Sequence, residues 1–467
     1  MSKQMIVAAL AAVATAVAWG EGAVKPLKVM MIGNSYSGSA FRQTPVVAKA
    51  CGCPLDLCSL NIGGCTLERH VQNVNNPTSK PYNVAWNWTS SEKPPFRHRG
   101  NIPEMLQAEK WDVVTIQQAS RLSFEADSYH PFGDTLVAAI RKYAPQAEIV
   151  VQETWSDDPA SRRIAELGFT SRQMYAALHK CYADFAAANG FRVIPTGTAV
   201  EFARDVMPLQ PKDKKHLGPA GEYLQALVWT AKLFKTDVTT CAYAPEGVTG
   251  EQAAALRKAA MRAVGGELPA YAGEIAKRKL MLAVFGGSFS RIPASDAAKD
   301  AWRQALDCTV ANYGIGGCGF LAGAAKTNDI VGQVNRALAS KMPYDAYILW
   351  ASTNDINKYS VDEQNAAIEH VVLHLRAKAP QAKVFFFGSL PLPLRPQANE
   401  KLGRFADGQR QTCAKLGVPY LDLFNQSGIT AENAAPLTCP DKTHLKAEGY
   451  AKIKDLQVEF LRKNLGK

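Results

Sequence analysis

The sequence predicts an α/β protein made of two tandem three-layer α/β/α domains, each with a mainly parallel five-stranded sheet. At 467 residues the chain is too long for one ordinary core. Short apolar runs alternate with longer stretches of helical periodicity along its whole length. One arrangement of serine, paired glycines and Asp-x-x-His also occurs twice, which indicates a duplicated unit.

The first residues have the features of a targeting signal. Lys3 supplies a positive charge, residues 5–17 are small or apolar, and Ala16-Val17-Ala18 is typical of a cleavage site. We therefore expect residues 1–18 to be a signal peptide and the mature protein to be secreted or periplasmic, with no stable membrane insertion after cleavage. An uncleaved anchor is the alternative reading.

The first domain is expected over residues 24–245. Its strands should be the short apolar runs Lys28–Ile32, Leu55–Asn61, Val113–Ile116, Glu148–Gln152 and Phe191–Pro195. Segments with helical periodicity separate them, among them Ser171–Ala188 and Pro219–Leu233. Near-continuous apolar strands between helices indicate a parallel sheet that is covered on both faces.

The second domain, expected over residues 278–467, repeats this order. Its predicted strands are Lys279–Phe285, Thr309–Tyr313, Ala346–Trp350, Lys383–Phe387 and Pro419–Phe424. A closing helix follows them. Residues 246–277 are expected to be a linker that contains an Ala-rich helix from Glu251 to Val264.

The first half carries a polar insertion, Asn75–Asn101, with alternating aromatic residues. We favour a hairpin with its own small core over a surface that stacks on a sugar ring, because alternating aromatics are first of all packing residues. The aromatic residues are Tyr82, Trp86, Trp88 and Phe96.

The duplicated arrangement begins at the end of the first strand in each half. Ser35 follows Gly33-Asn34, and Ser288 follows Gly286-Gly287. A glycine pair and a cysteine come later, and the interval from the serine to the second glycine is 29 residues in both copies. The later members are Gly63-Gly64-Cys65 with Asp213 and His216, and Gly316-Gly317-Cys318 with Asp441 and His444.

These residue types support nucleophilic catalysis. A serine hydroxyl becomes nucleophilic when a histidine takes its proton, and a carboxylate three residues before that histidine can orient the ring. The backbone N–H groups of the serine and of Gly64 or Gly317 can stabilise a developing oxyanion, and a side-chain amide can assist them. Both serines are expected at the carboxyl ends of their strands, where ligands bind to parallel sheets.

The chain resembles the SGNH, or GDSL-type, hydrolases, in which such a serine, a loop glycine, an asparagine and a late Asp-x-x-His form the site. The resemblance implies flavodoxin-like domains and ester hydrolysis without a metal or other cofactor. In the second copy it assigns Ser288, Gly317, Asn354 and the pair of Asp441 and His444.

The first copy departs from this family at one block. Trp111–Ser120 has no asparagine, so the block resembles branches in which a glutamine supplies the amide. Gln117 is our choice for the donor, with Gln118 as the alternative donor and as a substrate-binding candidate. Trp155, after the next strand, is a second substrate-binding candidate, although core packing would explain it equally well.

These inferences predict an exported serine hydrolase that cleaves acyl esters, such as acetyl esters on carbohydrate. Transfer of the acyl group to a sugar acceptor and a polysaccharide-binding protein with spent sites remain alternatives. Cys65 and Cys318 are interpreted as small buried residues beside the site. Lysines surround both histidines and form either a positive rim on each crevice or only a solvated turn; they are Lys212, Lys214, Lys215, Lys442 and Lys446.

Partners and metals are constrained by composition. The formal net charge is +11, but the basic residues are spread along the chain without a recognisable nucleic-acid motif, so no nucleic-acid partner is expected. The ten cysteines and the histidines do not stand at the spacing of metal ligands.

Overall fold

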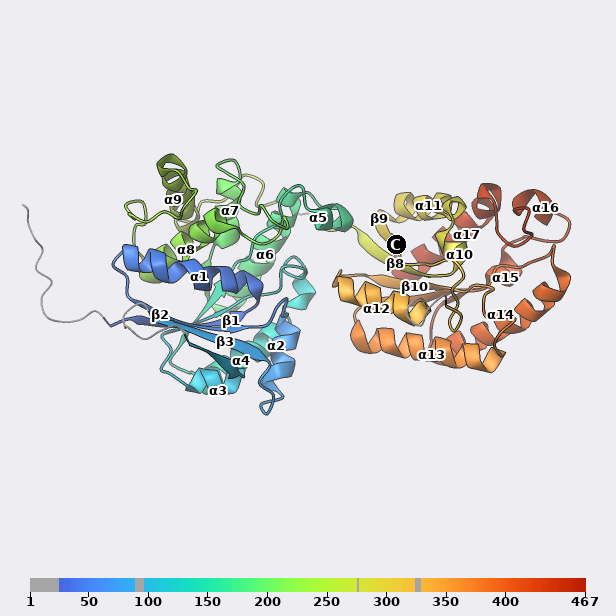
Figure 1. The fold of residues 1–467 in the computed structure, drawn as a ribbon, viewed down its shortest axis with the longest axis horizontal. Helices are drawn as coiled ribbons and strands as arrows, with labels where there is room; N and C mark the ends of the chain where they lie inside the picture. The colour runs from blue at the N-terminus through green and yellow to red at the C-terminus, as the bar shows by residue number, and fades with distance from the viewer. Residues whose placement is uncertain (1–24, 89–95, 275–276, 324–328) are drawn as a thin grey trace, which may run out of the picture.

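The computed structural model describes residues 25–88, 96–274, 277–323 and 329–467. These residues form two lobes side by side, each with a β-sheet between layers of helices (Figure 1). The two tandem α/β/α units predicted from the sequence are thereby confirmed. The predicted signal peptide, residues 1–18, lies outside the described residues.

The first sheet has seven strands in the order β4-β3-β2-β1-β5-β6-β7. Five neighbouring strands are parallel and follow the flavodoxin-like order, namely β2, β1, β5, β6 and β7. Strands β3 and β4 are antiparallel additions at one edge. The strands are β1 (Leu27–Gly33), β2 (Leu55–Asn61), β3 (Tyr82–Trp88), β4 (Phe96–Gly100), β5 (Val113–Ile116), β6 (Glu148–Gln152) and β7 (Arg192–Ile194).

The second sheet is wholly parallel and has five strands in the order β12-β11-β10-β8-β9. Read from β9, this is the same strand order as in the parallel part of the first sheet, so the duplication extends to topology. The strands are β8 (Leu280–Gly286), β9 (Cys308–Asn312), β10 (Ala346–Trp350), β11 (Lys383–Phe387) and β12 (Tyr420–Leu421).

Two apolar layers enclose the first sheet, because alternate residues of β1 point to opposite faces. Val29 and Met31 pack in one core, and Met30 and Ile32 pack in the other. Helices α1, α7, α8 and α9 lie over one face, and α2, α3 and α4 over the other (Figure 1). The helices are α1 (Ser35–Ala50), α2 (Leu67–Val74), α3 (Ile102–Gln107), α4 (Phe132–Tyr143), α5 (Arg162–Leu167), α6 (Ser171–Asn189), α7 (Thr196–Ala203), α8 (Pro219–Phe234) and α9 (Gly250–Val264).

Helix α9 is the Ala-rich helix predicted within the linker. It packs on α7 and α8, and Ala253, Leu256 and Ala260 are buried in the same core as β1. The helix is therefore part of the first lobe and not only a linker. It differs from the expectation because its small apolar side chains pack against α7 and α8.

The second lobe is layered in the same way. Helices α12 and α13 cover one face of the sheet, and α11 and α17 cover the other (Figure 1). The helices are α10 (Ser288–Arg291), α11 (Asp296–Leu306), α12 (Ile330–Ser340), α13 (Val361–Lys378), α14 (Pro396–Leu416), α15 (Leu423–Gln426), α16 (Ala434–Leu437) and α17 (Ala447–Leu465). No helix in the described ranges is long and apolar enough to span a bilayer.

The insertion at 75–101 forms a hairpin, as the aromatic alternation suggested. Its strands β3 and β4 pair with each other and extend the first sheet through β2. Tyr82 and Trp86 are buried on the side of α2 and α3. The hairpin thus adds a wall beside the end of β1, which bears on the site described below.

Arg278 joins the two lobes. Its guanidinium donates to Asp345 of the second lobe at 2.6 and 2.8 Å and forms an ion pair with Glu125 of the first lobe. The N–H of the next residue, Lys279, donates to the carbonyl of Leu167 at 3.2 Å. These contacts fix α5 of the first lobe against the start of β8.

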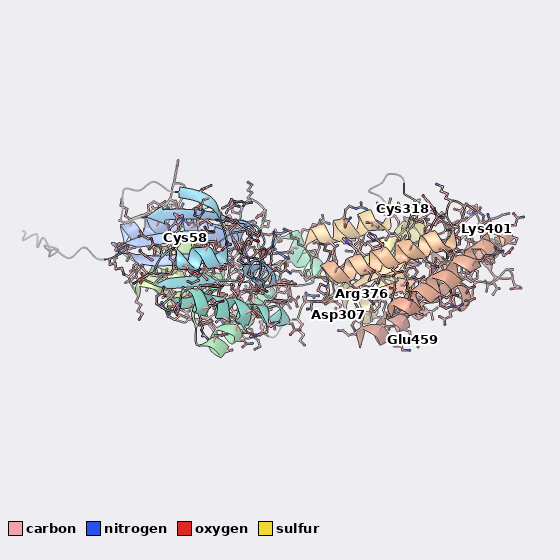
Figure 2. All side chains as sticks on the ribbon, turned by 90° about the horizontal axis from the view of Figure 1, so that it is seen from below. Cys58, Asp307, Cys318, Arg376, Lys401 and Glu459 are labelled. Carbon is pink, nitrogen blue, oxygen red and sulfur yellow. The ribbon has the colours of Figure 1, made fainter. Side chains whose placement is uncertain are left out.

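The ten cysteines all lie in the described part of the chain, and none of them forms a disulfide there. Cys58 lies in the first lobe and Cys318 in the second (Figure 2). Burial raises the pKa of the Cys65 thiol to about 12, which removes it as a nucleophile at neutral pH. The interpretation of Cys65 and Cys318 as small buried residues agrees with their positions.

Candidate active site

Each lobe brings its serine, histidine and aspartate into one hydrogen-bonded chain. In the first lobe Ser35 Oγ lies 2.8 Å from His216 Nε2, and His216 Nδ1 lies 2.6 Å from Asp213 Oδ2. In the second lobe, Ser288 Oγ lies 2.7 Å from His444 Nε2, and Nδ1 of that ring lies 2.5 Å from an oxygen of Asp441. The residues that sequence spacing had paired are therefore assembled in both copies.

The strand ends explain where the serines stand. Ser35 follows β1 directly and is the first residue of α1, while Ser288 follows β8 and begins α10. β1 lies between β2 and β5 and β8 lies between β9 and β10, so each serine emerges where the strand order reverses. Crevices for ligands form at this point in parallel sheets.

The two Asp-x-x-His turns have the same shape. Asp213 Oδ1 accepts the backbone N–H groups of Lys215 and His216 at 3.0 and 2.8 Å. Lys214 has a φ of 61° and Lys442, its counterpart, a φ of 58°. This left-handed residue reverses the chain tightly enough for the carboxylate to meet both the backbone and the ring of the histidine.

Both carboxylates are strong acids in this setting. Partial burial by itself would raise the pKa of Asp213, but hydrogen bonds from the His216 ring and from two backbone N–H groups outweigh it and lower the pKa to about 2. The pKa of Asp441 is lowered to about 2 by the same balance. Each aspartate is thus ionised at neutral pH and can hold the Nδ1 proton of its histidine.

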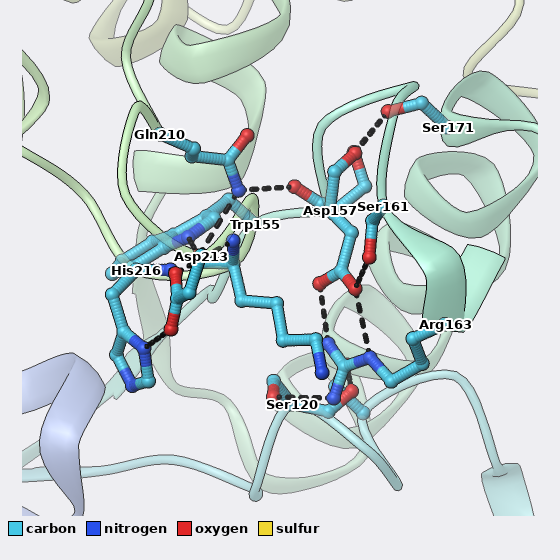
Figure 3. A network of polar contacts seen from close by, with 12 residues as sticks. Ser120, Trp155, Asp157, Ser161, Arg163, Ser171, Gln210, Asp213 and His216 are labelled. Atoms are coloured by element: carbon cyan, nitrogen blue, oxygen red, sulfur yellow. Dashed lines mark hydrogen bonds and ion pairs between the residues drawn. The ribbon is translucent and has the colours of Figure 1, made fainter.

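A buried platform supports the first turn from behind (Figure 3). Trp155 Nε1 donates to the carbonyl of Lys215 at 2.8 Å, and Gln210 Nε2 donates to the same carbonyl at 3.0 Å. The Tyr36 ring stacks on Trp155 with centroids 4.3 Å apart. Trp155 is 0% exposed, so it positions the catalytic turn and does not line the pocket, unlike the substrate-binding role expected for it.

A glycine turn faces each serine. The N–H of Cys65 donates to the carbonyl of Ile62 at 3.1 Å, and Gly64 between them has a φ of 60°. Gly317 has a φ of 78° in the equivalent turn, which Cys318 closes. A positive φ at this place suits glycine.

The amides predicted from the sequence behave differently in the two copies. Asn354 Nδ2 donates to the carbonyl of Cys318 at 2.8 Å and lies 3.2 Å from Ser352 Oγ. In the first copy Gln117 is 3% exposed, and its Nε2 donates to Asn34 Oδ1 at 2.9 Å. The Gln117 amide nitrogen therefore points at Asn34, the residue before the nucleophile.

Gln118 is fully engaged within the fold. Its Oε1 accepts the N–H groups of Leu67 and Ala119 at 3.1 and 2.8 Å, and its Nε2 donates to the carbonyl of Ser128 at 2.9 Å. The side chain is 1% exposed. It therefore ties loops together, which differs from its expected contact with substrate.

Two cavities meet at Ser35 and His216. One has a volume of about 340 Å³ and is lined by Gly64, Arg121, Lys215 and, from the second lobe, Lys341. The other, of about 690 Å³, runs between α1 and the added hairpin. Its polar lining was not foreseen from the sequence and consists of Arg42, Ser59, Asn61, Asn83, Arg97 and His98.

The sequence signals for the missed residues are weak. Asn34 is a single polar residue before the nucleophile, and Arg121 stands one residue past the Trp111–Ser120 block. Lys341 belongs to the other lobe, and nothing in its surrounding sequence indicates a role at the first serine.

The fold, the two hydrogen-bonded chains and the glycine turns are those of the SGNH type of hydrolase domain, present in two copies. The first lobe matches the family described as domain of unknown function DUF4886 over residues 28–263, and the second matches the GDSL-like lipase/acylhydrolase family over residues 284–452. The chain belongs to the DUF4886 family through its first lobe, and the match of its second lobe indicates a domain of an ester-hydrolase family.

Individual relatives are more distant. A solved DUF4886 family protein from Bacteroides uniformis is 30% identical and covers 54% of this chain and 98% of its own, with a TM-score of 0.49. An acetylxylan esterase from Geobacillus stearothermophilus, solved as a catalytic mutant, is 11% identical over 39% of this chain and 94% of its own, with a TM-score of 0.32. The human platelet-activating factor acetylhydrolase IB subunit alpha2 is 25% identical over 165 residues, which are 33% of this chain and 65% of that relative.

Proposed function

We propose that the protein is an exported hydrolase of small acyl esters on carbohydrate, with a Ser-His-Asp acyl-enzyme site in each lobe. The observation that carries this proposal is the unbroken serine–histidine–aspartate chain, which recurs in both copies with contacts of 2.5 to 2.8 Å. Two independent copies with the same contacts are hard to explain by surface pairing alone.

The mechanism follows from the order of these groups. Ser35 Oγ attacks the ester carbonyl while His216 Nε2 takes its proton, and the negative charge on the carbonyl oxygen is met by the N–H groups of Ser35 and Gly64. His216 then gives the proton to the leaving alcohol, which produces the acyl-enzyme. A water molecule, deprotonated by the same ring, attacks the acyl carbon and releases the acid and the serine.

The shape of the first site favours a polar alcohol. The larger cavity beside Ser35 is lined by Phe41, Val84 and Ala85 together with hydroxyl, amide, imidazole and guanidinium groups, and these polar groups suit the hydroxyl-rich surface of a sugar. Few large apolar side chains line either cavity, so a long acyl chain would gain little from binding there. A short acyl group such as acetyl fits this setting best.

The serine mechanism is tested with three full-length variants, Ser35→Ala, Ser288→Ala and the double variant. Each single variant should lose labelling of its own lobe by a serine-directed phosphonate, and the double variant should lose turnover of 4-nitrophenyl acetate. Ser340→Ala is the matched control, since Ser340 lines the first cavity outside the hydrogen-bonded chain. Continued turnover by the double variant would exclude the mechanism.

The substrate class is tested with a panel of acetylated glycans and aliphatic esters of increasing chain length. We expect kcat/KM to be highest for acetylated sugars and to fall as the acyl chain lengthens. A preference for long-chain esters would contradict the carbohydrate assignment without affecting the serine mechanism.

A further inference from the structure

The side-chain amides of Asn34 and Asn354 contact equivalent backbone carbonyls in the two lobes, although the two residues stand at different points of their domains. Asn34 Nδ2 donates to the carbonyl of Cys65 at 3.1 Å, and Asn354 Nδ2 donates to the carbonyl of Cys318 at 2.8 Å. Cys65 and Cys318 are equivalent residues, each directly after the glycine turn. The same acceptor is thus used by the residue before the nucleophile in one lobe and by a later loop residue in the other.

Gly287 shows how close the position before the nucleophile lies to the amide of Asn354. It precedes Ser288 as Asn34 precedes Ser35. A Cβ atom on Gly287 would lie 2.9 Å from Asn354 Nδ2 and 2.5 Å from the carbonyl oxygen of Cys318. A side chain at this position therefore reaches the neighbourhood of the Asn354 amide, and each lobe has an amide from one of the two positions there.

Strand register excludes an equivalent role for Gln117. Ile32 pairs with Ile116, and Phe285 pairs with Leu349. Because Ile32 and Phe285 both stand three residues before their serine, Gln117 corresponds to the last residue of β10. Gln117 remains at the level of the sheet, and the residue that corresponds to Asn354 is Arg121.

Three contacts fix the orientation of the Asn34 amide. Its Oδ1 accepts the N–H of Tyr36 at 3.1 Å and Gln117 Nε2 at 2.9 Å, so the oxygen cannot exchange places with the nitrogen without losing both bonds. One Nδ2 proton is used on Cys65. Among the described residues the second Nδ2 proton has no acceptor, and Asn34 lines the cavity that also contains Ser35 and Gly64.

We propose that Asn34 supplies the side-chain oxyanion donor of the first site and that Gln117 is a positioning residue that holds the Asn34 amide. The inference rests on the ester hydrolysis proposed above. In the tetrahedral intermediate the former carbonyl oxygen carries the negative charge, and Asn34 Nδ2 donates to it beside the N–H groups of Ser35 and Gly64. The two lobes thus reach one catalytic arrangement through different residues.

The test uses the full chain with Ser288→Ala as the parent, so that only the first site turns over. Asn34→Asp keeps the acceptor for Tyr36 and Gln117 but lacks the amide donor, and Asn34→Ser keeps an uncharged helix cap. Both variants should lower kcat by about 10²–10³ with KM nearly unchanged, as expected for a donor used in the transition state.

Gln117→Ala should lower kcat less, by about tenfold, because Asn34 remains but is held less firmly. Combined with Asn34→Ser it should cause no further loss, since Gln117 acts through Asn34. The reverse result, a full loss for Gln117→Ala with near-parental kcat for Asn34→Ser, would overturn the assignment. A parent without Ser35-dependent turnover would refute the proposed function itself, which separates the two failures.

A second observation concerns charge in the smaller cavity of the first site. Arg121 donates to the carbonyl of Gly64 at 2.7 Å, and both Arg121 Nη1 and Lys341 Nζ lie 3.4 Å from where a Cβ of Gly64 would stand. Within the described part of the chain, neither side chain is ion-paired with a carboxylate. Two positive groups of the described chain therefore flank Gly64 without a carboxylate partner.

The rest of the lining does not balance this charge. Lys215 adds a third cation, while Arg163 is neutralised by its bidentate contact with buried Asp157. Glu166 is the acid that lines the cavity, and it already accepts from Arg162 at 2.7 Å. Burial lowers the pKa of Arg121, as do its cationic neighbours, so an anion at this place would relieve an unfavourable charge.

We infer that this cavity is a subsite for a carboxylate carried by the ester substrate and that the second lobe contributes to it through Lys341. The inference rests on the proposed hydrolase function and specifies its substrate as an ester of an acidic sugar. Arg121 offers a planar fork and Lys341 a point charge, a combination that suits a carboxylate.

The experiment compares kcat/KM for acetylated glucuronic acid with that for its neutral amide, again in the Ser288→Ala chain. The acid should be preferred by about tenfold at low salt, and Lys341→Met should lower kcat/KM for the acid several-fold more than kcat/KM for the amide, so that most of the preference is lost. Lys235→Met is the matched control, because Lys235 is also a left-handed C-cap lysine, with φ of 52° against 57° for Lys341, but lies at the end of α8.

Equal kcat/KM for the acid and the amide in the parent would overturn the subsite. A preference that survives Lys341→Met would overturn the contribution of the second lobe. Loss of turnover on both substrates in the parent would instead refute the proposed hydrolysis.

Discussion

Replacing Asp213 by asparagine should inactivate the first site without unfolding it. Asp213 uses one oxygen for the backbone N–H groups of Lys215 and His216 and the other for His216 Nδ1. An asparagine can keep the first set of contacts with its carbonyl oxygen, so the turn survives. Its NH₂ group then faces Nδ1, which must become an acceptor, and the ring proton moves to Nε2.

A proton on Nε2 prevents His216 from taking the proton of Ser35, which lies 2.8 Å away. In comparable triads the wrong tautomer lowers kcat by about 10⁴, which corresponds to roughly 5.4 kcal/mol of activation free energy. The side chains of Asp213 and His216 are both 44% exposed, so water can partly substitute for the carboxylate. We therefore expect a loss of about 10³–10⁴.

The assay is steady-state hydrolysis of 4-nitrophenyl acetate by the full chain carrying Ser288→Ala. Asp441→Asn in the same background is the control, because Asp441 serves the other histidine and should leave first-site turnover unchanged. Circular dichroism and melting temperature verify the fold of each variant. A kcat within threefold of the parent for Asp213→Asn would show that the carboxylate does not orient the ring, and the reasoning would fail.

Three further outcomes follow from contacts described above. Gly287→Ala should lower kcat of the second site by at least tenfold, measured with Ser35→Ala as the parent, because the new Cβ would meet the carbonyl of Cys318 at 2.5 Å; parental kcat would contradict the crowding at this position. Arg278→Met should lower the free energy of unfolding by about 1–3 kcal/mol in urea titrations, since it leaves the carboxylate of Asp345, 26% exposed, without its cation; an unchanged midpoint would show that the contact is not stabilising. The Asp441 carboxyl has a pKa of about 2 in the folded chain and about 3.9 in unfolded chains, so its contribution to stability is complete above pH ~4 and disappears as the pH falls to ~2. The difference in melting temperature between the parent and Asp441→Asn should therefore shrink over that range, and a constant difference would argue against the depressed pKa.

Much of the fold was accessible from the sequence because it depends on local patterns. The apolar runs at Val113–Ile116 and Ala346–Trp350 coincide with β5 and β10, and the serines follow β1 and β8 as expected. The repeated interval between serine and glycine reflects the shared path from the first strand to the glycine turn. The hairpin was expected too, but its addition to the sheet depends on pairing with β2, which no local pattern reveals.

The first site was harder to predict from the sequence, because its chemistry depends on the register between strands and on which side chains lie close together in the fold. Asn34 is next to the nucleophile in the sequence, but only the pairing of β5 with β1 shows that Gln117 donates to the Asn34 side chain. Trp155 follows a strand as many pocket residues do, yet the stacked ring of Tyr36 and the carbonyl of Lys215 enclose it. The approach of Lys341 depends on how the two lobes dock.

Lys214 and Lys442, the left-handed residues of the two turns, each combine a backbone conformation with a side-chain charge, and these two properties are independent. The backbone conformation, with φ near 60° at both places, requires a residue that tolerates this region, whereas a positive charge beside the histidine is a matter of the side chain alone. Asparagine tolerates the same conformation without the charge. One position therefore encodes both the geometry that joins aspartate to histidine and the electrostatic field at the mouth of the crevice, and evolution can alter the second while the first stays intact.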